Sequence, residues 1–342
     1  MLLAGIQVLG LLSCLLIAKS TAAVAFADVP SVPLSNAAVA GLRMPVIGLG
    51  TWAYGFPGEK WNDTIGGITA GQFIKLGGRR IDGALGYGDQ AGVGKGILAS
   101  GIERSELFVT SKIPCYGYNE TLKNVDEALS TLNMSYVDLL LIHWPYSKSK
   151  VFTTDPNCKP DTAASAKTCR QSVWRALEAV FRSGRARAIG VSNFEQNHLQ
   201  DILDMADALV PAVNQVEFHP YWHEDDLVAF CQKRNITYNS YSPLSCPDWA
   251  PKTHFWSKKH GALDEDVVMQ AAKAHGKTPA QVVIRWAWQQ GVVVNPRTYS
   301  TQHMAENLAV FDFELSAAEM AAISSIKPPK LNKVCPDPHK DP

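Results

Sequence analysis

Short apolar runs alternate with helix-like segments along most of the chain. Seven runs have the length of strands and are mostly apolar on both faces, as is typical of parallel strands covered by helices; they are 80–83, 107–112, 137–143, 186–190, 212–217, 237–241 and 292–295. The segments between them favour helices at roughly 69–76, 92–100, 120–132, 171–183, 197–206, 225–234, 264–275, 279–289 and 301–309. A further strand near 46–50 would bring the expected number to eight.

This alternation favours an α/β fold, a closed (β/α)₈ TIM barrel in a single domain, because no linker or change of composition divides 44–326. A doubly wound sheet that binds a dinucleotide is the alternative. Gly86–Ala91 spells G-x-G-x-x-A between a strand and a helix, although such a motif alone is weak evidence. A phosphate loop at 92–96 is excluded, since Gly96 stands where Ser or Thr should hold magnesium.

The two ends of the chain differ from this pattern. Residues 2–18 carry no charge, and small-x-small sites follow at 23–27, so residues 1–27 are predicted to be a secretory signal peptide or hydrophobic leader. An uncleaved membrane anchor and a plastid presequence are the alternatives. Residues 30–326 form the predicted barrel, and 327–342 form a Pro-rich tail that is not helical.

Composition narrows the classes of partner. Lys+Arg and Asp+Glu are both 32, so nothing favours a nucleic acid or an anionic membrane. The seven cysteines include no C-x-x-C pair, which gives zinc or thioredoxin chemistry little support. Cys158 and Cys169 share one polar loop, 146–170, and could pair in an oxidising compartment. N-x-S/T sites at Asn62, Asn119, Asn133 and Asn235 are compatible with transit through the endoplasmic reticulum.

Four chemically active side chains occupy or follow the ends of three predicted strands: Asp82, Tyr87, Lys112 and His143. The carboxyl ends of barrel strands share one face, so we expect the four to meet there. Lys112 would stabilise the phenolate of Tyr87 and lower its pKa, Asp82 would fix Lys112, and His143 would orient a carbonyl oxygen. Each residue alone has a structural alternative, such as an ion pair or a core histidine. Together they favour proton transfer to a carbonyl.

Longer stretches resemble the aldo-keto reductases. The resemblance covers about 30–326 and rests on 44–52 (MPVIGLGTW), 81–82 with Tyr87, 93–94, 111–112, 141–145 (LIHWP), 190–194 (GVSNF), 214–215, 219–221, 241–244 (YSPL), 292–297 (VVVNPR), 305–307 and 311–316. It implies a (β/α)₈ barrel, NADPH across the carboxyl-end face, and reduction of aldehydes and ketones without a metal. The Gly86 motif is then a coincidence, and Tyr87 is the acid in reduction and the base in oxidation.

The resemblance also implies a cofactor site, carried over position by position. Tyr241 would stack on the nicotinamide, and Ser192, Asn193 and Gln215 would hold its carboxamide. The other implied contacts are Thr51 and Trp52; Ser242, Leu244 and Ser245 at the pyrophosphate; Asp248, which ties this loop to Arg297; Arg297 and Thr298 at the 2′-phosphate; His303; and Glu306 and Asn307 at the adenine. Trp52, Tyr87, His143 and Trp144 would contact substrate, whereas Trp222 is expected to be plain packing.

Four positions depart from the family pattern. His303 stands where a second arginine is usual, so we expect NADPH to remain preferred while use of NADH stays open. Asn295 replaces an apolar residue, and Gly78 and Arg80 replace an aromatic residue and a histidine before Ile81. Neither Gly78 nor Arg80 is expected to touch the reaction, but local packing there should differ.

The sequence therefore predicts an NADPH-dependent oxidoreductase that reduces aldehyde or ketone groups of small molecules or sugars, with Tyr87 as general acid. The alternative is a non-catalytic NADPH-binding regulatory or structural protein on the same fold, which fold alone does not exclude. We expect a monomer with no integral membrane role once the leader is cleaved. An exported enzyme would lack reduced nicotinamide, so retention in the secretory pathway or an organelle lumen is favoured over secretion, membrane anchoring or a plastid.

Overall fold

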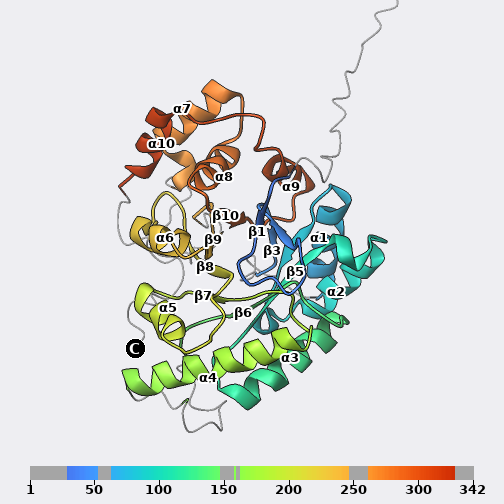
Figure 1. Cartoon of the computed structure of the whole chain (residues 1–342). Coiled ribbons are helices and arrows are strands. Elements are labelled where there is room, and N and C mark those ends of the chain that lie inside the picture. The colour runs from blue at the N-terminus through green and yellow to red at the C-terminus, as the bar shows by residue number, and fades with distance from the viewer. Residues whose placement is uncertain (1–28, 53–62, 147–157, 159–161, 246–260, 328–342) are drawn as a thin grey trace, which may run out of the picture.

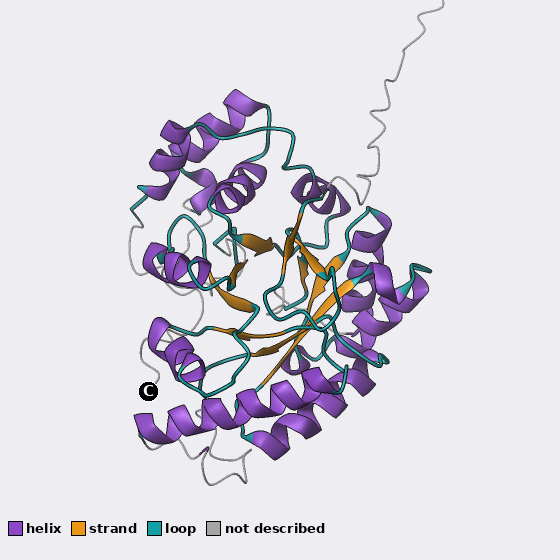
Figure 2. Ribbon diagram, viewed as in Figure 1, coloured by secondary structure: helices purple, strands orange, loops and turns teal. Residues whose placement is uncertain are grey.

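A ring of parallel strands lies at the centre of the molecule, with helices around it (Figures 1 and 2). The computed structural model describes residues 29–52, 63–146, 158, 162–245 and 261–327. Neighbouring strands pair in chain order, and they are β3 (Leu49–Gly50), β4 (Arg80–Asp82), β5 (Phe108–Ile113), β6 (Leu139–Ile142), β7 (Ile189–Ser192), β8 (Val213–Glu217), β9 (Thr237–Tyr241) and β10 (Val293–Asn295).

The ring closes between its first and last strands. Ile47 forms a parallel bridge with Val294, the Gly48 N–H donates to the Val294 carbonyl at 3.0 Å, and the Val294 N–H donates to the Val46 carbonyl at 3.0 Å. A doubly wound sheet would leave two unpaired edges here. The predicted TIM barrel is therefore confirmed, and the alternative of an open dinucleotide-binding sheet is wrong.

Helices follow the strands and cover the outside of the barrel (Figure 2). Those that alternate with strands are α1 (Asp63–Lys75), α2 (Gln90–Ala99), α3 (Tyr118–Leu132), α4 (Ala163–Arg182), α5 (Gln196–Leu203), α6 (Asp225–Gln232), α8 (Pro279–Gln289) and α9 (Thr301–Leu308). Two further helices, α7 (Asp266–His275) and α10 (Ala317–Ser324), pack against each other beside α8. No helix in the part of the chain that the structure describes is long and apolar enough to cross a membrane.

The helix boundaries follow from local sequence. Thr278 caps α8 by accepting a hydrogen bond from the Gln281 N–H, and Pro279 takes the first position, where no backbone donor is needed. Asn133 ends α3 in the left-handed conformation (φ 54°), which asparagine tolerates better than most residues. The apolar face predicted for α3 is buried against the barrel.

The glycines of α2 allow close packing of neighbouring helices. A Cβ on Gly92 would lie 1.6 Å from the Asp63 carbonyl oxygen on α1, and one on Gly94 would lie 2.2 Å from the Leu132 oxygen on α3. Gly88 ends the short 3₁₀ turn Leu85–Tyr87 with a φ of 74°. Packing and turn geometry therefore explain the glycine pattern that first suggested a dinucleotide loop.

A short antiparallel hairpin, β1 (Ser31–Pro33) and β2 (Arg43–Pro45), precedes the barrel. Between its strands, the Asn36 side-chain amide donates to the carbonyls of Ile189 (2.9 Å) and Val210 (2.8 Å), and its oxygen accepts from the Ile189 N–H. Ile189 is the first residue of β7. The hairpin therefore lies at the amino ends of the strands, opposite the face expected to carry the site.

The prediction of one loop over 146–170 is wrong. Helix α4 begins at Ala163, and Thr162 caps it by accepting from the Ser165 N–H. Its first turns are rich in Ala, Ser and Thr and lack the apolar periodicity that marks a helix. Cys169 consequently lies on α4, where it is disulfide-bonded to Cys158. The predicted leader, 1–27, and the tail beyond 327 lie outside the described residues.

Candidate active site

A buried ion pair between β4 and β5 forms the base of the site. The strand register sets Asp82 opposite Thr110, so Lys112, two residues further, lies on the same face of the sheet. Lys112 Nζ lies 2.5 Å from Asp82 Oδ1, and it also donates to the Gly83 carbonyl at 2.9 Å and to Tyr87 Oη at 3.2 Å. The side chains of Lys112 and Asp82 are 1% and 6% exposed. This pairing holds one ammonium against the phenol.

The Tyr87 ring faces the other aromatic side chains of the site. Its centroid lies 5.5 Å from that of His143 in an edge-to-face arrangement and 6.2 Å from that of Trp52. The Trp144 ring stacks beside His143, with centroids 6.3 Å apart. All four side chains are half-buried, so a small molecule could reach the phenol and the imidazole together.

His143 follows the end of β6 and is held through its backbone. Its N–H donates to the Ile113 carbonyl at 2.8 Å, and its carbonyl accepts from Asn193 Nδ2 at 2.9 Å. Removal from water and, to a smaller extent, the Lys112 ammonium lower the pKa of His143 to about 3. The imidazole is therefore neutral near pH 7, where it can direct a hydrogen bond but cannot act as a charged acid.

A second polar group lies at the ends of β7, β8 and β9. Ser192 Oγ donates to the Gln215 carbonyl at 2.8 Å, and the Tyr241 hydroxyl donates to Asn193 Oδ1 at 2.8 Å. Gln215 Nε2 also donates to Asp82 Oδ2 at 2.7 Å. The residues predicted separately for catalysis and for the cofactor thus form one hydrogen-bonded network, a connection that sequence reasoning missed.

Several residues of this face have positive φ angles. Asn193 (62°) and Ser242 (49°), directly after β7 and β9, and Ser245 (55°) all take the left-handed conformation. Such conformations cost free energy in residues other than glycine and often occur at binding sites. At Asn193 the conformation is held by hydrogen bonds from both ends of the side-chain amide.

The remaining predicted contacts spread over the same end of the barrel. Thr51 is buried, and its N–H donates a hydrogen bond to the Asp82 carbonyl at 3.0 Å. Arg297 and Thr298 follow β10 and are half-buried, and Leu244 and Trp222 are half-buried as well. Helix α9 carries exposed His303, half-buried Glu306 and buried Asn307. Asp248 lies outside the described residues.

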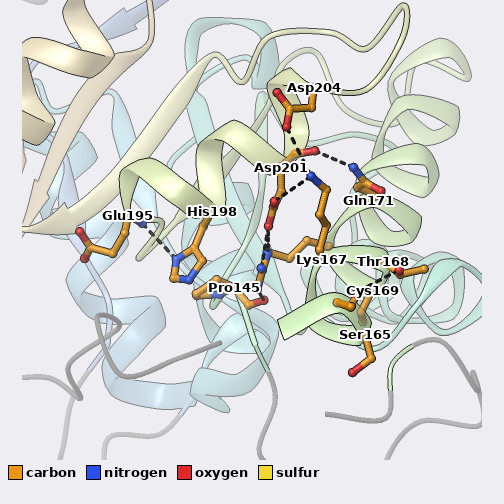
Figure 3. Close-up of polar contacts among 12 residues, drawn as sticks. Pro145, Ser165, Lys167, Thr168, Cys169, Gln171, Glu195, His198, Asp201 and Asp204 are labelled. Carbon is orange, nitrogen blue, oxygen red and sulfur yellow. Dashed lines mark hydrogen bonds and ion pairs between the residues drawn. The ribbon is translucent and has the colours of Figure 1, made fainter. Parts of the chain in front are cut away.

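Arg170 holds the segment that follows His143 and Trp144, and the sequence analysis did not identify this arginine. Its Nη1 donates to the Pro145 carbonyl at 3.3 Å, while Nε and Nη2 donate to Asp201 Oδ2 at 3.0 and 2.6 Å. Figure 3 shows Asp201 on α5 directed at α4 and at the segment of Pro145. The available signal was an arginine at a buried position of α4, beside Val173 and Trp174. Such a buried charge needs partners.

No group of three or more His, Cys, Asp or Glu side chains that could hold a metal occurs among the described residues. The arrangement instead offers a phenol, an ammonium and a neutral imidazole beside a set of amides. These groups suit proton transfer at a carbonyl oxygen and binding of a polar aromatic cofactor.

The model of the aldo/keto reductase family matches residues 46–328. The chain belongs to this family. Among similar reductases, it is 38% identical over 301 residues to a morphine 6-dehydrogenase of Pseudomonas putida, covering 87% of this chain and 91% of the relative. It is also 38% identical over 300 residues to a glyoxal reductase of Bacillus subtilis, covering 87% and 94%.

Solved structures of aldo-keto reductases share the fold. One is a Bombyx mori aldo-keto reductase in complex with NADP, which is 28% identical to this chain. It superposes with a TM-score of 0.72, covering 86% of this chain and 92% of its own length. The aldo-keto reductase barrel and the membership of this chain in an oxidoreductase family therefore rest on sequence and structure together.

Proposed function

We propose that this aldo-keto reductase is an NADPH-dependent enzyme that reduces aldehyde or ketone groups of small molecules to alcohols, with Tyr87 as general acid. The observation that carries the proposal is the position of Lys112. Its ammonium contacts the Asp82 carboxylate at 2.5 Å and the Tyr87 hydroxyl at 3.2 Å. A structural ion pair alone would not require the phenol.

The polar network at the ends of β7–β9 fits a nicotinamide cofactor. Ser192, Asn193 and Gln215 present hydroxyl and amide groups that match a carboxamide, and the half-buried Tyr241 ring lies beside them. Arg297 and Thr298, before α9, suit a phosphate group. NADPH, when bound, supplies the hydride. The NADP complex of the Bombyx mori relative supports this assignment.

Side chains of the protein then carry out the proton transfer. The Tyr87 hydroxyl gives its proton to the carbonyl oxygen, and the Lys112 ammonium stabilises the phenolate that remains. Asp82 balances the charge of Lys112, and neutral His143 donates a hydrogen bond that orients the substrate oxygen. In alcohol oxidation the same phenolate accepts the proton.

The proposed substrates are small aldehydes, ketoacids or sugars. Trp52 and Trp144 border the pair formed by Tyr87 and His143, so the reacting carbonyl enters between aromatic side chains. The names of the two relatives, a glyoxal reductase and a morphine 6-dehydrogenase, support carbonyl and alcohol chemistry over a wide range of substrate sizes.

Tyr87→Phe tests the proposed acid role. NADPH consumption is measured with a panel of aldehydes and ketones that includes glyoxal, and NADPH affinity is measured separately by fluorescence titration. We expect kcat to fall by about 10²–10⁴-fold while the affinity for NADPH is kept. Equal rates in the two proteins would defeat the role of Tyr87. Tight binding of NADPH without turnover of any substrate would favour the non-catalytic alternative.

We further propose that the protein acts as a monomer in the secretory pathway or an organelle lumen. The Cys158–Cys169 disulfide supports an oxidising compartment. N-terminal sequencing of the mature protein and imaging of a tagged copy test the compartment, and a cytosolic, uncleaved protein would overturn it. Light scattering during size-exclusion chromatography tests the monomer.

A further inference from the structure

Three cysteines meet between β5 and α4. Cys169 is bonded to Cys158, and the thiol sulfur of Cys115 lies 3.7 Å from the Cys169 sulfur. All three residues are buried, with exposed fractions of 3% for Cys115, 6% for Cys158 and 5% for Cys169. A thiol in contact with a disulfide sulfur is the arrangement from which thiol–disulfide exchange begins.

The three sulfurs come from separate segments. Cys115 follows β5, three residues after Lys112; Cys158 lies in the connection from β6 to α4; and Cys169 lies on α4 beside Arg170. Figure 3 shows Cys169 near the segment of Pro145. A small pocket that is lined by all three cysteines and by Pro145 and Tyr146 adjoins them. The sulfurs therefore connect elements that carry the proposed active site.

We propose that these residues form a thiol–disulfide exchange site, in which Cys169 bonds to Cys158 in one form and to Cys115 in the other. The Cys115 sulfur, after losing its proton to solvent, attacks the sulfur of Cys169. The Cys115–Cys169 bond forms as the Cys158–Cys169 bond breaks, and Cys158 leaves as a thiolate that takes up a proton. The exchange involves no net oxidation or reduction and needs no other reactant.

The Cys158–Cys169 bond of the structure is the resting form, and the environment of Cys115 slows its exchange. Burial raises the pKa of the Cys115 thiol to about 12, and the nearby Arg170 guanidinium offsets only part of this. The attacking thiolate is therefore scarce at neutral pH, so exchange is slower than with an exposed thiol. An isolated buried cysteine would also have a raised pKa; the contact with a disulfide distinguishes this one.

Exchange would move a covalent link from one part of the site to another. In the resting form α4 is tied to the connection that follows Pro145. In the other form α4 is tied to the end of β5, close to Lys112, and Cys158 becomes a free thiol that a disulfide reagent can modify. The sulfur site therefore offers a covalent link that can change partners next to the proposed catalytic end of the barrel.

The test maps the partners of Cys169 in the wild-type protein. Trypsin should place the cysteines in three peptides, 113–123, 151–167 and 168–170, so each pairing gives a distinct mass. The protein is equilibrated in a series of glutathione redox buffers, acid-quenched, alkylated and digested without reduction. We expect the 113–123/168–170 pair to appear together with alkylated Cys158. Loss of the Cys158–Cys169 pair with only free thiols at Cys115 and Cys169 would overturn the proposal.

Two variants sharpen this test. Cys158→Ser, oxidised in air, should form the Cys115–Cys169 disulfide nearly completely, whereas Cys115→Ser should keep the Cys158–Cys169 bond in every buffer that preserves it in wild type. Circular dichroism checks that both variants are folded. Free thiols at Cys115 and Cys169 in folded, oxidised Cys158→Ser would again contradict exchange. The readout is a disulfide map, so it does not depend on enzymatic activity.

Discussion

The Arg80 guanidinium donates through Nη2 to the Asn295 amide oxygen at 2.5 Å, across the closure of the barrel. The same nitrogen donates to the Val294 carbonyl at 2.6 Å, and Arg80 is 1% exposed. A Cβ on Gly48 would lie 2.5 Å from Arg80 Nε, so glycine is needed there. Two departures from the family pattern, Arg80 and Asn295, therefore form a single interaction.

Asn295→Leu should destabilise the protein, although it restores an apolar residue. The change removes an acceptor from a buried guanidinium, whose pKa burial has already lowered to about 10. We expect a loss of about 1–3 kcal/mol in the free energy of unfolding, measured by urea denaturation. The double variant Arg80→Met/Asn295→Leu should recover part of this loss, because no buried charge remains. Equal losses in the single and double variants would contradict the pairing.

The neutral His143 imidazole should make stability depend on pH. Its folded-state pKa of about 3 lies below that of an exposed histidine, about 6.5, so the unfolded chain binds more protons between these values. Stability from this group is complete above about pH 6.5 and is lost as the pH falls toward 3. Between pH 7 and pH 5 the loss should be up to about 2 kcal/mol.

Urea denaturation of wild type and His143→Asn at the two pH values measures this effect. The variant should lose less stability on acidification, and the difference isolates His143 from the other histidines. The same pH dependence in both proteins would show that His143 is not held neutral.

Arg170→Met should loosen the segment that carries His143 and Trp144. Breaking the contact of buried Arg170 with Asp201 and Pro145 should cost about 3 kcal/mol in stability and raise KM for the carbonyl substrate more than it lowers kcat. Lys167→Met is the matched control. Lys167 contacts the same Asp201 carboxylate at 3.3 Å, but its side chain is 41% exposed, so the change should cost under about 1 kcal/mol.

For both variants, urea denaturation measures the free energy of unfolding, and steady-state kinetics measure KM and kcat. An Arg170→Met protein that is destabilised but keeps its KM would have a structural role only. Similar effects of the two substitutions would show that burial of Arg170 does not matter.

The charges near α9 should set the preference for NADPH over NADH. Arg297 is half-buried just after β10, and His303 is exposed on α9. Arg297→Met should lower the ratio of kcat/KM for NADPH to that for NADH by about 10–100-fold, since it removes the proposed charge-assisted contact with the 2′-phosphate. His303→Arg should raise the ratio. A wild-type preference for NADH would contradict the assignment.

The sequence predicted some helix boundaries and missed others. Helix α8 was predicted at its observed bounds, because Thr278 and Pro279 give a local signal for its start. The start of α4 was missed, because its first turns lack apolar periodicity and its cap, Thr162, is not followed by a proline as Thr278 is. Helix α10 was missed despite Ser316 and Glu319, which form a capping box readable in the sequence.

In the candidate site, the limit is the distance along the chain between residues that interact. Strand ends and motifs placed Asp82, Tyr87 and Lys112 at one edge, where the structure brings them together. The Gln215–Asp82 hydrogen bond joins residues 133 positions apart, and no local sequence pattern predicts it. Likewise, a buried arginine on α4 signals only that partners exist, and the fold is needed to identify them.

The position of Asn36 has a consequence for synthesis of the chain. Its side chain bonds to Ile189 and Val210, which follow it by 153 and 174 residues. At ribosomal rates of about 5–20 residues per second, Ile189 is made about 8–30 seconds after Asn36. The hairpin that covers the amino ends of the strands cannot form these contacts during that interval. The hairpin, which is translated before the barrel, is thus among the last elements to reach its final contacts.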